Sequence, residues 1–161
     1  MLSIKPQWLQ KILDGSKTIE LRKSRPDLTP PFKVHFYCTG KGTKDPHEIL
    51  EVHSGGKIHR VNGLVAGECI CDRIDRIVLV GATGSYAPTR YQIADYQGHY
   101  APADKLFEDA CLTEKQVTEY LSGRVGYGWH ISGVKVYDVP KTLGCFGLNF
   151  APQSWRYLIQ L

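Results

Sequence analysis

The chain has 161 residues, of which 42% are hydrophobic and 22% charged, and its formal net charge at pH 7 is +4. This length and composition predict one compact domain, residues 1–161, and the mild basicity excludes a histone-like tail. No apolar run approaches the roughly 20 residues that a membrane-spanning helix needs, and residues 1–20 carry charges throughout, so we expect neither a membrane span nor a signal peptide.

The basic residues are unevenly distributed along the chain. Residues 1–60 hold 11 Lys and Arg against 6 Asp and Glu, whereas residues 61–161 hold 9 against 10. Such a bias favours an anionic partner such as RNA or a nucleotide, although ordinary surface charge would also produce it. The five cysteines form an odd number without framework spacing, which predicts free thiols and a cytoplasmic location.

The first predicted helix begins at Pro6, because proline lacks the N–H that would be unsatisfied at that position. Apolar residues then recur at helical spacing, namely Trp8, Leu9, Ile12 and Leu13. Gly15 suits the left-handed conformation that commonly ends a helix. The sequence therefore predicts a short amphipathic helix that ends near residue 14.

Residues 15–22 place three ionisable groups in a strand-like segment directly after this helix. In a strand, alternate side chains share a face, so Thr18, Glu20 and Arg22 are expected to point one way. Lys17 lies at the turn that leaves the helix, from where it is expected to reach round the end of the strand to the same carboxylate. The pattern predicts a polar cluster for ligand binding or catalysis, or else an exposed strand face with a weak ion pair.

The next predicted strand, residues 34–38, alternates with Val34, Phe36 and Cys38 inward. Residues 39–60 are rich in Gly, Lys and His and predict a mobile loop or hairpin that turns at 54–56.

Two longer strands follow, at residues 63–80 and 127–139, with an insertion around 81–125 between them that we predict to be helical. Within this insertion, Thr113 and Gln116 have the spacing of a capping box at the start of a helix.

Residues 15–22 spell G-x-K-x-x-E-x-R after a helix, which resembles the signature of the ASCH domain family of PUA-like proteins. The first predicted strand at residues 2–6 and the late segment 128–137 are also similar to that family. The resemblance implies an α+β fold that is mainly β, a small PUA-like β-barrel with peripheral helices. It covers the whole chain in the order of its elements.

The same resemblance implies a range of functions, because the family and its relatives include RNA binders, modified-base readers, a ribonuclease-type activity and an amidohydrolase acting on an acetylated cytidine. We expect a protein that binds RNA, a nucleotide or a modified nucleobase. The alternatives are a hydrolase on a nucleoside or RNA, and a regulatory module that binds another protein.

The candidate ligand-binding residues combine the charged cluster with nearby aromatic and polar side chains. They are Lys17, Thr18, Glu20, Arg22, Tyr37, Trp129 and His130. Tyr37, Tyr127 and Trp129 would stack on a base, unless they are core residues instead.

If the protein is an enzyme, Lys17 and Glu20 are the catalytic candidates. In the amidohydrolases that the chain resembles, a threonine nucleophile occupies the position of Glu20, and its absence here argues against that chemistry. These enzymes also use a second catalytic carboxylate. No residue of this chain clearly corresponds to it, and Asp95 is the nearest candidate.

The sequence predicts no metal site and no cofactor. Cys69 and Cys71 are separated by a single residue, and the six histidines lack the spacing of a zinc motif. No segment has the glycine pattern of a phosphate-binding loop.

Overall fold

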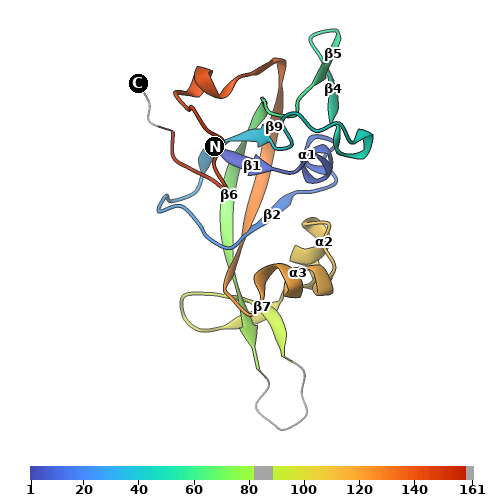
Figure 1. Cartoon of the computed structure of the whole chain (residues 1–161). Coiled ribbons are helices and arrows are strands. Elements are labelled where there is room, and N and C mark those ends of the chain that lie inside the picture. Colours follow the sequence, from blue (N-terminus) through green and yellow to red (C-terminus); the bar gives the residue numbers. More distant parts are fainter. Residues whose placement is uncertain (82–88, 159–161) are drawn as a thin grey trace. The chain divides into compact units, whose positions relative to one another are not determined.

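The computed structural model describes residues 1–81 and 89–158 (Figure 1). The chain divides into two compact units. Unit 1 comprises Met1–Ser16, Lys33–Ile70 and Ser132–Leu161, and unit 2 comprises Lys17–Phe32 and Cys71–Ile131.

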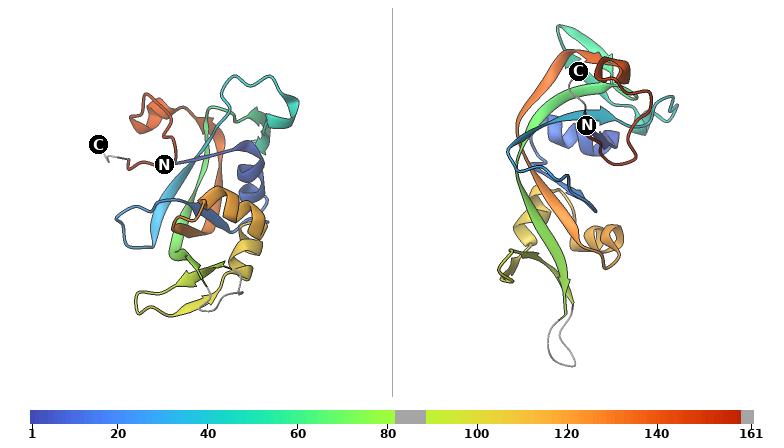
Figure 2. Two further views of the ribbon diagram at one scale, coloured as in Figure 1. Left: turned by 60° about the horizontal axis from the view of Figure 1, so that its bottom comes forward. Right: turned by 90° about the vertical axis from the view of Figure 1, so that its left-hand side faces the viewer.

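Strands β6 (Val65–Val80) and β9 (Gly126–Lys141) each contribute residues to both units. These two strands pair with each other and run side by side in both views of Figure 2.

Unit 1 contains a parallel pair of strands, β1 (Leu2–Ile4) and β3 (Phe32–Cys38), in which Leu2 lies opposite Phe36. A separate antiparallel hairpin is formed by β4 (Glu51–Ser54) and β5 (Lys57–Arg60). Two 3-10 helices, η1 (Pro46–Glu48) and η2 (Leu143–Phe146), complete the unit.

Helix α1 (Pro6–Leu13) lies where the sequence predicts it. Pro6 occupies its first turn, Leu9 and Ile12 are its buried residues, and Gly15 has a φ of +82° just beyond its end. The helix thus delivers the chain to Lys17, at the start of unit 2.

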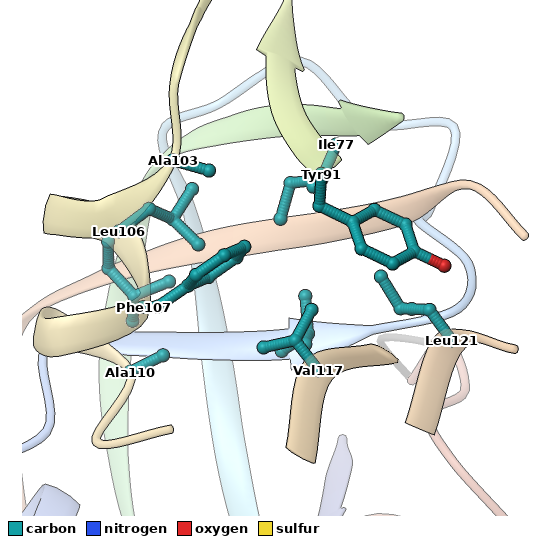
Figure 3. Close-up of a cluster of buried hydrophobic side chains, with 10 residues drawn as sticks. Ile77, Tyr91, Ala103, Leu106, Phe107, Ala110, Val117 and Leu121 are labelled. Atoms are coloured by element: carbon teal, nitrogen blue, oxygen red, sulfur yellow. The ribbon is translucent and has the colours of Figure 1, made fainter. Parts of the chain in front are cut away.

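Unit 2 combines strands and helices around a core of its own. Its further elements are β2 (Ile19–Arg22), β7 (Arg90–Ala94), β8 (Tyr100–Pro102), α2 (Asp104–Asp109) and α3 (Glu114–Leu121). The buried side chains of this core come from β2, β6, β7 and both helices (Figure 3). Leu106 and Phe107 of α2 and Val117 and Leu121 of α3 line the helical side of this core.

The start of α3 has the capping box that the sequence predicts. The Thr113 side chain accepts from the Gln116 backbone N–H at 3.2 Å, and the Gln116 side chain accepts from the Thr113 N–H at 2.9 Å. The surrounding segment 81–125 contains β7 and β8 as well as α2 and α3, and its residues 82–88 lie outside the described part of the chain.

The fold is α+β and mainly β, as the sequence predicts. Hydrogen bonds link the main strands in the order β1-β3-β6-β7-β8, while β9 pairs with both β6 and β2. Among the described residues this sheet does not close into a ring, so the predicted barrel is an open sheet here. None of the described helices is both long and apolar enough to cross a membrane.

Candidate functional site

Strand β2 carries the charged cluster, and its pairing with β9 determines which side chains lie beside it. Glu20 is opposite Trp129, and Arg22 is opposite Tyr127. Directly opposed residues of antiparallel strands point to the same face, so these four side chains share one face of the β2–β9 pair.

The other face of this pair turns toward the core of unit 2. Ile19 and Leu21 are buried there, and a Cβ on Gly128, opposite Leu21, would lie 2.9 Å from the side chain of Leu106.

Lys17, Glu20 and Arg22 form a buried ion cluster. Lys17 Nζ lies 3.2 Å from Glu20 Oε2, and Arg22 Nη2 lies 2.9 Å from Glu20 Oε1. The three residues are only 2%, 7% and 8% exposed. The predicted convergence of two cations on one carboxylate is therefore present in the structure, and the exposed-strand alternative is not.

The ammonium group of Lys17 is further fixed by the end of helix α2. It donates to the backbone carbonyl of Ala110 at 2.7 Å. Burial lowers the pKa of Lys17 below its usual value, and the charge of Glu20 opposes this effect. Lys17 is therefore a more acidic ammonium than an exposed lysine.

Aromatic side chains surround the cluster in two different environments. Trp129 is 3% exposed and packs edge-on against Phe32, with ring centroids 5.9 Å apart and planes at 83°. Tyr127 is half-buried. Trp129 is therefore a packed wall beside Glu20, which agrees with the core alternative that the sequence left open.

Tyr120 belongs to this site although the sequence did not single it out. It lies on α3 and is 39% exposed, and burial raises the pKa of its hydroxyl, with smaller influences from Arg22 and Glu20. Lys23 Nζ lies 4.8 Å from its ring centroid. In the sequence, only its position on the helix, close to the buried residues Val117 and Leu121, could have indicated that Tyr120 belongs to the site.

His130 lies on the opposite face from Glu20, because it pairs with Ile19 in the strand register. Its Nε2 is 2.7 Å from Asp75 Oδ2, and Arg73 Nε is 3.0 Å from Asp75 Oδ1. The structure thus separates His130 from the charged cluster and places it in a hydrogen-bonded network with Arg73 and Asp75 of β6.

Two other predicted ligand-binding residues have structural roles. Tyr37 is 5% exposed and belongs to the core of unit 1, because β3 is covered on both faces over this part of the strand. Thr18 is exposed, and its backbone fixes the start of β2: its N–H donates to Asp109 O at 2.9 Å, and its carbonyl accepts from Ile131 N–H at 2.8 Å.

Asp95, the nearest sequence candidate for a second carboxylate, organises the β7–β8 turn. It accepts from the backbone N–H groups of Gln97 and His99 at 2.8 and 2.9 Å and lies 2.8 Å from His99 Nδ1. The carboxylate that contacts the predicted site residue His130 is that of Asp75. Among residues 1–81 and 89–158, no group of three or more His, Cys, Asp and Glu side chains could hold a metal ion.

The net positive charge does not lie in the unit that carries the cluster. Unit 1 has ten basic and six acidic residues, whereas unit 2 has ten of each. The sequence analysis assigned the excess of positive charge to the part that carries the motif, because it divided the chain at residue 60. In the structure, however, residues 33–70 belong to unit 1 together with the C-terminal segment.

The fold that holds these features is similar to that of solved ASCH proteins. The structure is similar to the crystal structure of ASCH from Zymomonas mobilis, with a TM-score of 0.61 and 18% identity over 99% of this chain and 86% of that chain. Two variants of that protein, with tyrosine replaced by phenylalanine and serine by alanine, give TM-scores of 0.60 at 17% and 16% identity. They match over 99% of this chain and 88% and 87% of theirs.

The ASCH-like fold implied by the sequence resemblance is thereby confirmed, with an open sheet in place of the predicted barrel. No family model and no curated protein matches the sequence.

Proposed function

We propose that this protein binds RNA and that Glu20 accepts hydrogen bonds from the edge of an unpaired nucleobase. The observation that carries the proposal is the buried carboxylate held between two cations. A carboxylate has about four acceptor positions, and Glu20 is engaged by one cation on each oxygen. It therefore retains capacity to accept from a base N–H or exocyclic amine.

Stability alone is a poor explanation for such a cluster. Removing charges from water costs several kcal/mol per ion, so a buried ion pair is often no more stabilising than apolar residues of similar volume. The ion pairs with Lys17 and Arg22 instead hold the Glu20 carboxylate in a fixed orientation. Fixed orientation of an acceptor is what discrimination between base edges requires.

The surroundings of Glu20 suit a nucleotide as well as a base. Lys17 and Arg22 together outweigh the one carboxylate by a single positive charge, which favours a ligand that carries phosphate. Tyr120 and Tyr127 are partly exposed and offer aromatic faces for stacking, with Lys23 beside Tyr120. Because unit 2 has no net charge, we expect base contacts to contribute more there than long-range attraction.

The test compares the affinity of single-stranded RNA for the native protein and for Glu20→Gln. The glutamine keeps the shape but replaces one acceptor oxygen by a donor, so we expect affinity to fall by about 10- to 100-fold and the base preference to change. Lys115→Ala is the matched control, because Lys115 is 85% exposed and pairs only loosely with Glu119 at 3.9 Å. Equal affinities for the native protein and folded Glu20→Gln would refute the proposal.

A hydrolase is the second candidate, and the lowered pKa of Lys17 is the observation that favours it. Burial shifts Lys17 toward the neutral amine that can act as a base or nucleophile. Incubation with acetylated cytidine, or with short RNA, tests for released acetate or strand cleavage. Absence of turnover, or turnover that survives Lys17→Met, would eliminate this candidate and leave binding.

A further inference from the structure

A second polar cluster lies in unit 1, on side chains that the proposed base site does not use. His35 of β3, Glu68 of β6 and Tyr137 of β9 form a hydrogen-bonded chain. The Tyr137 hydroxyl donates to Glu68 Oε2 at 2.9 Å, and His35 Nδ1 lies 2.7 Å from the same hydroxyl. Lys33 Nζ is 3.1 Å from the other oxygen of Glu68.

The positions of the protons in this chain determine the form of the histidine. Burial opposes ionisation of Glu68, but the Tyr137 hydrogen bond and Lys33 outweigh it, so the pKa of Glu68 is lowered and the carboxylate carries no proton. Tyr137 has one proton and donates it to Glu68. Its oxygen must therefore accept from His35, which places the imidazole proton on Nδ1.

Nε2 of His35 is consequently a fixed hydrogen-bond acceptor. Burial lowers the pKa of His35, which keeps the ring neutral at pH 7. Nε2 makes no hydrogen bond to any residue that the structure describes, and the side chain is 17% exposed. The chain of Glu68, Tyr137 and His35 thus orients one lone pair that no described protein group uses.

The charged groups around this acceptor are mainly positive. Lys33 and Lys141 act on His35 electrostatically, against the single carboxylate of Glu68. Lys141 Nζ lies 4.4 Å from the Tyr137 ring centroid, and the Phe146 ring lies 4.9 Å from the imidazole. The excess of four positive charges in unit 1 has the same sign.

We propose that His35 Nε2 accepts a hydrogen bond from a ribose 2′-hydroxyl, so that unit 1 carries a sugar-phosphate site that distinguishes RNA from DNA. A neutral acceptor requires a ligand with a donor, and neighbouring cations favour an anion. A ribonucleotide has both, with the hydroxyl next to the phosphate, and the 2′-hydroxyl is the group that DNA lacks. This inference rests on the proposed RNA binding but uses a different set of residues.

The test measures affinities for a uridine hexamer and for the matching deoxyuridine hexamer, which differ only at the sugar. The native protein should bind the RNA about five- to tenfold more tightly, the effect of one lost hydrogen bond. In His35→Asn the side-chain amide can still donate to Tyr137, but no group replaces Nε2. We expect this variant to bind both hexamers with the affinity of the native protein for DNA.

Glu20→Gln separates the two proposals. Because Glu20 is proposed to contact the base, this variant should lower the affinity for both hexamers by the same factor and keep the preference for RNA. If the native protein has no such preference, or if His35→Asn retains it, the sugar site is refuted while base binding stands. If neither hexamer binds, both proposals fall.

Nitrogen NMR of the histidine rings provides a direct readout of the acceptor. The native protein should show His35 with its proton on Nδ1, and the Nε2 signal should shift when the uridine hexamer binds. A His35 ring protonated on Nε2 in the native protein would overturn the inference.

Discussion

At the scale of single residues, Glu20 is the side chain on which the charged cluster depends. Its carboxylate forms ion pairs with both Lys17 and Arg22. Both cations are almost completely buried, so each relies on Glu20 for compensation of its charge.

Replacement Glu20→Ala should therefore lower the free energy of unfolding by about 3–5 kcal/mol, because it leaves two buried cations without their counter-ion. Urea denaturation at pH 7 measures this loss. Glu119→Ala is the control, since Glu119 is 66% exposed and its removal should change stability by less than about 1 kcal/mol. A similar small effect for both variants would show that the cluster is solvated.

Asp75 should make the stability of the protein depend on pH in the acid range. Burial opposes its ionisation, but His130 and Arg73 outweigh burial and lower its pKa below 3.8. The stabilisation is then complete above pH 3.8 and is lost as the pH falls through the lowered value.

We expect Asp75→Asn to be less stable than the native protein at pH 6, and the difference between the two to shrink at pH 3 and below. Chemical denaturation at several pH values measures it. A difference that stays constant from pH 6 to pH 2 would contradict this assignment.

At the scale of elements, the capping box should stabilise α3. Thr113→Ala removes the side-chain acceptor for the Gln116 N–H and should destabilise the protein by about 1 kcal/mol. Thr118→Ala is the matched control, because Thr118 is an exposed interior position of the same helix, where alanine is favourable. Thermal denaturation should therefore rank Thr113→Ala below the native protein and Thr118→Ala at or above it.

The pairing of β6 with β9 requires a glycine in unit 1. A Cβ on Gly67 would clash with the backbone carbonyl oxygen of Lys135, which cannot move aside like a flexible side chain. Gly67→Ala should destabilise the protein by about 1–3 kcal/mol.

Gly144→Ala tests whether this cost is specific to the strand pair, since the added methyl group there meets nothing closer than 3.7 Å. Equal melting temperatures for the two glycine variants would contradict the close approach of the strands.

Local patterns were sufficient to predict several elements. Proline and glycine delimit α1, Thr113 and Gln116 mark the start of α3, and alternation identifies β3. The register between strands was not predictable, because a shift of one residue exchanges the two faces. That is why the sequence grouped both Trp129 and His130 with Glu20, whereas the register places Trp129 on the same face as Glu20 and His130 on the other.

Contacts between residues far apart in the chain could not be predicted from the sequence either. Asp75 and His130 are 55 residues apart, and Glu68 and Tyr137 are 69 apart, so no local spacing relates them. The Lys17–Glu20–Arg22 cluster was predictable for the opposite reason, since its members lie within six consecutive residues of the chain.

At the scale of the whole molecule, the two units differ in charge. Unit 2 carries the buried carboxylate and is neutral overall, and unit 1 carries the excess of positive charge. This difference assigns base contacts to unit 2 and sugar-phosphate contacts to unit 1 in our proposals. RNA affinity should therefore decrease with rising salt concentration, while Glu20→Gln should leave the slope of this dependence unchanged.

A crystal structure with a short single-stranded RNA tests the central claim most directly. We predict a nucleobase edge within about 3.2 Å of the Glu20 carboxylate, with both cations still paired to it. An RNA bound elsewhere, with Glu20 contacting only Lys17 and Arg22, would contradict the assignment of this cluster as the base-binding site.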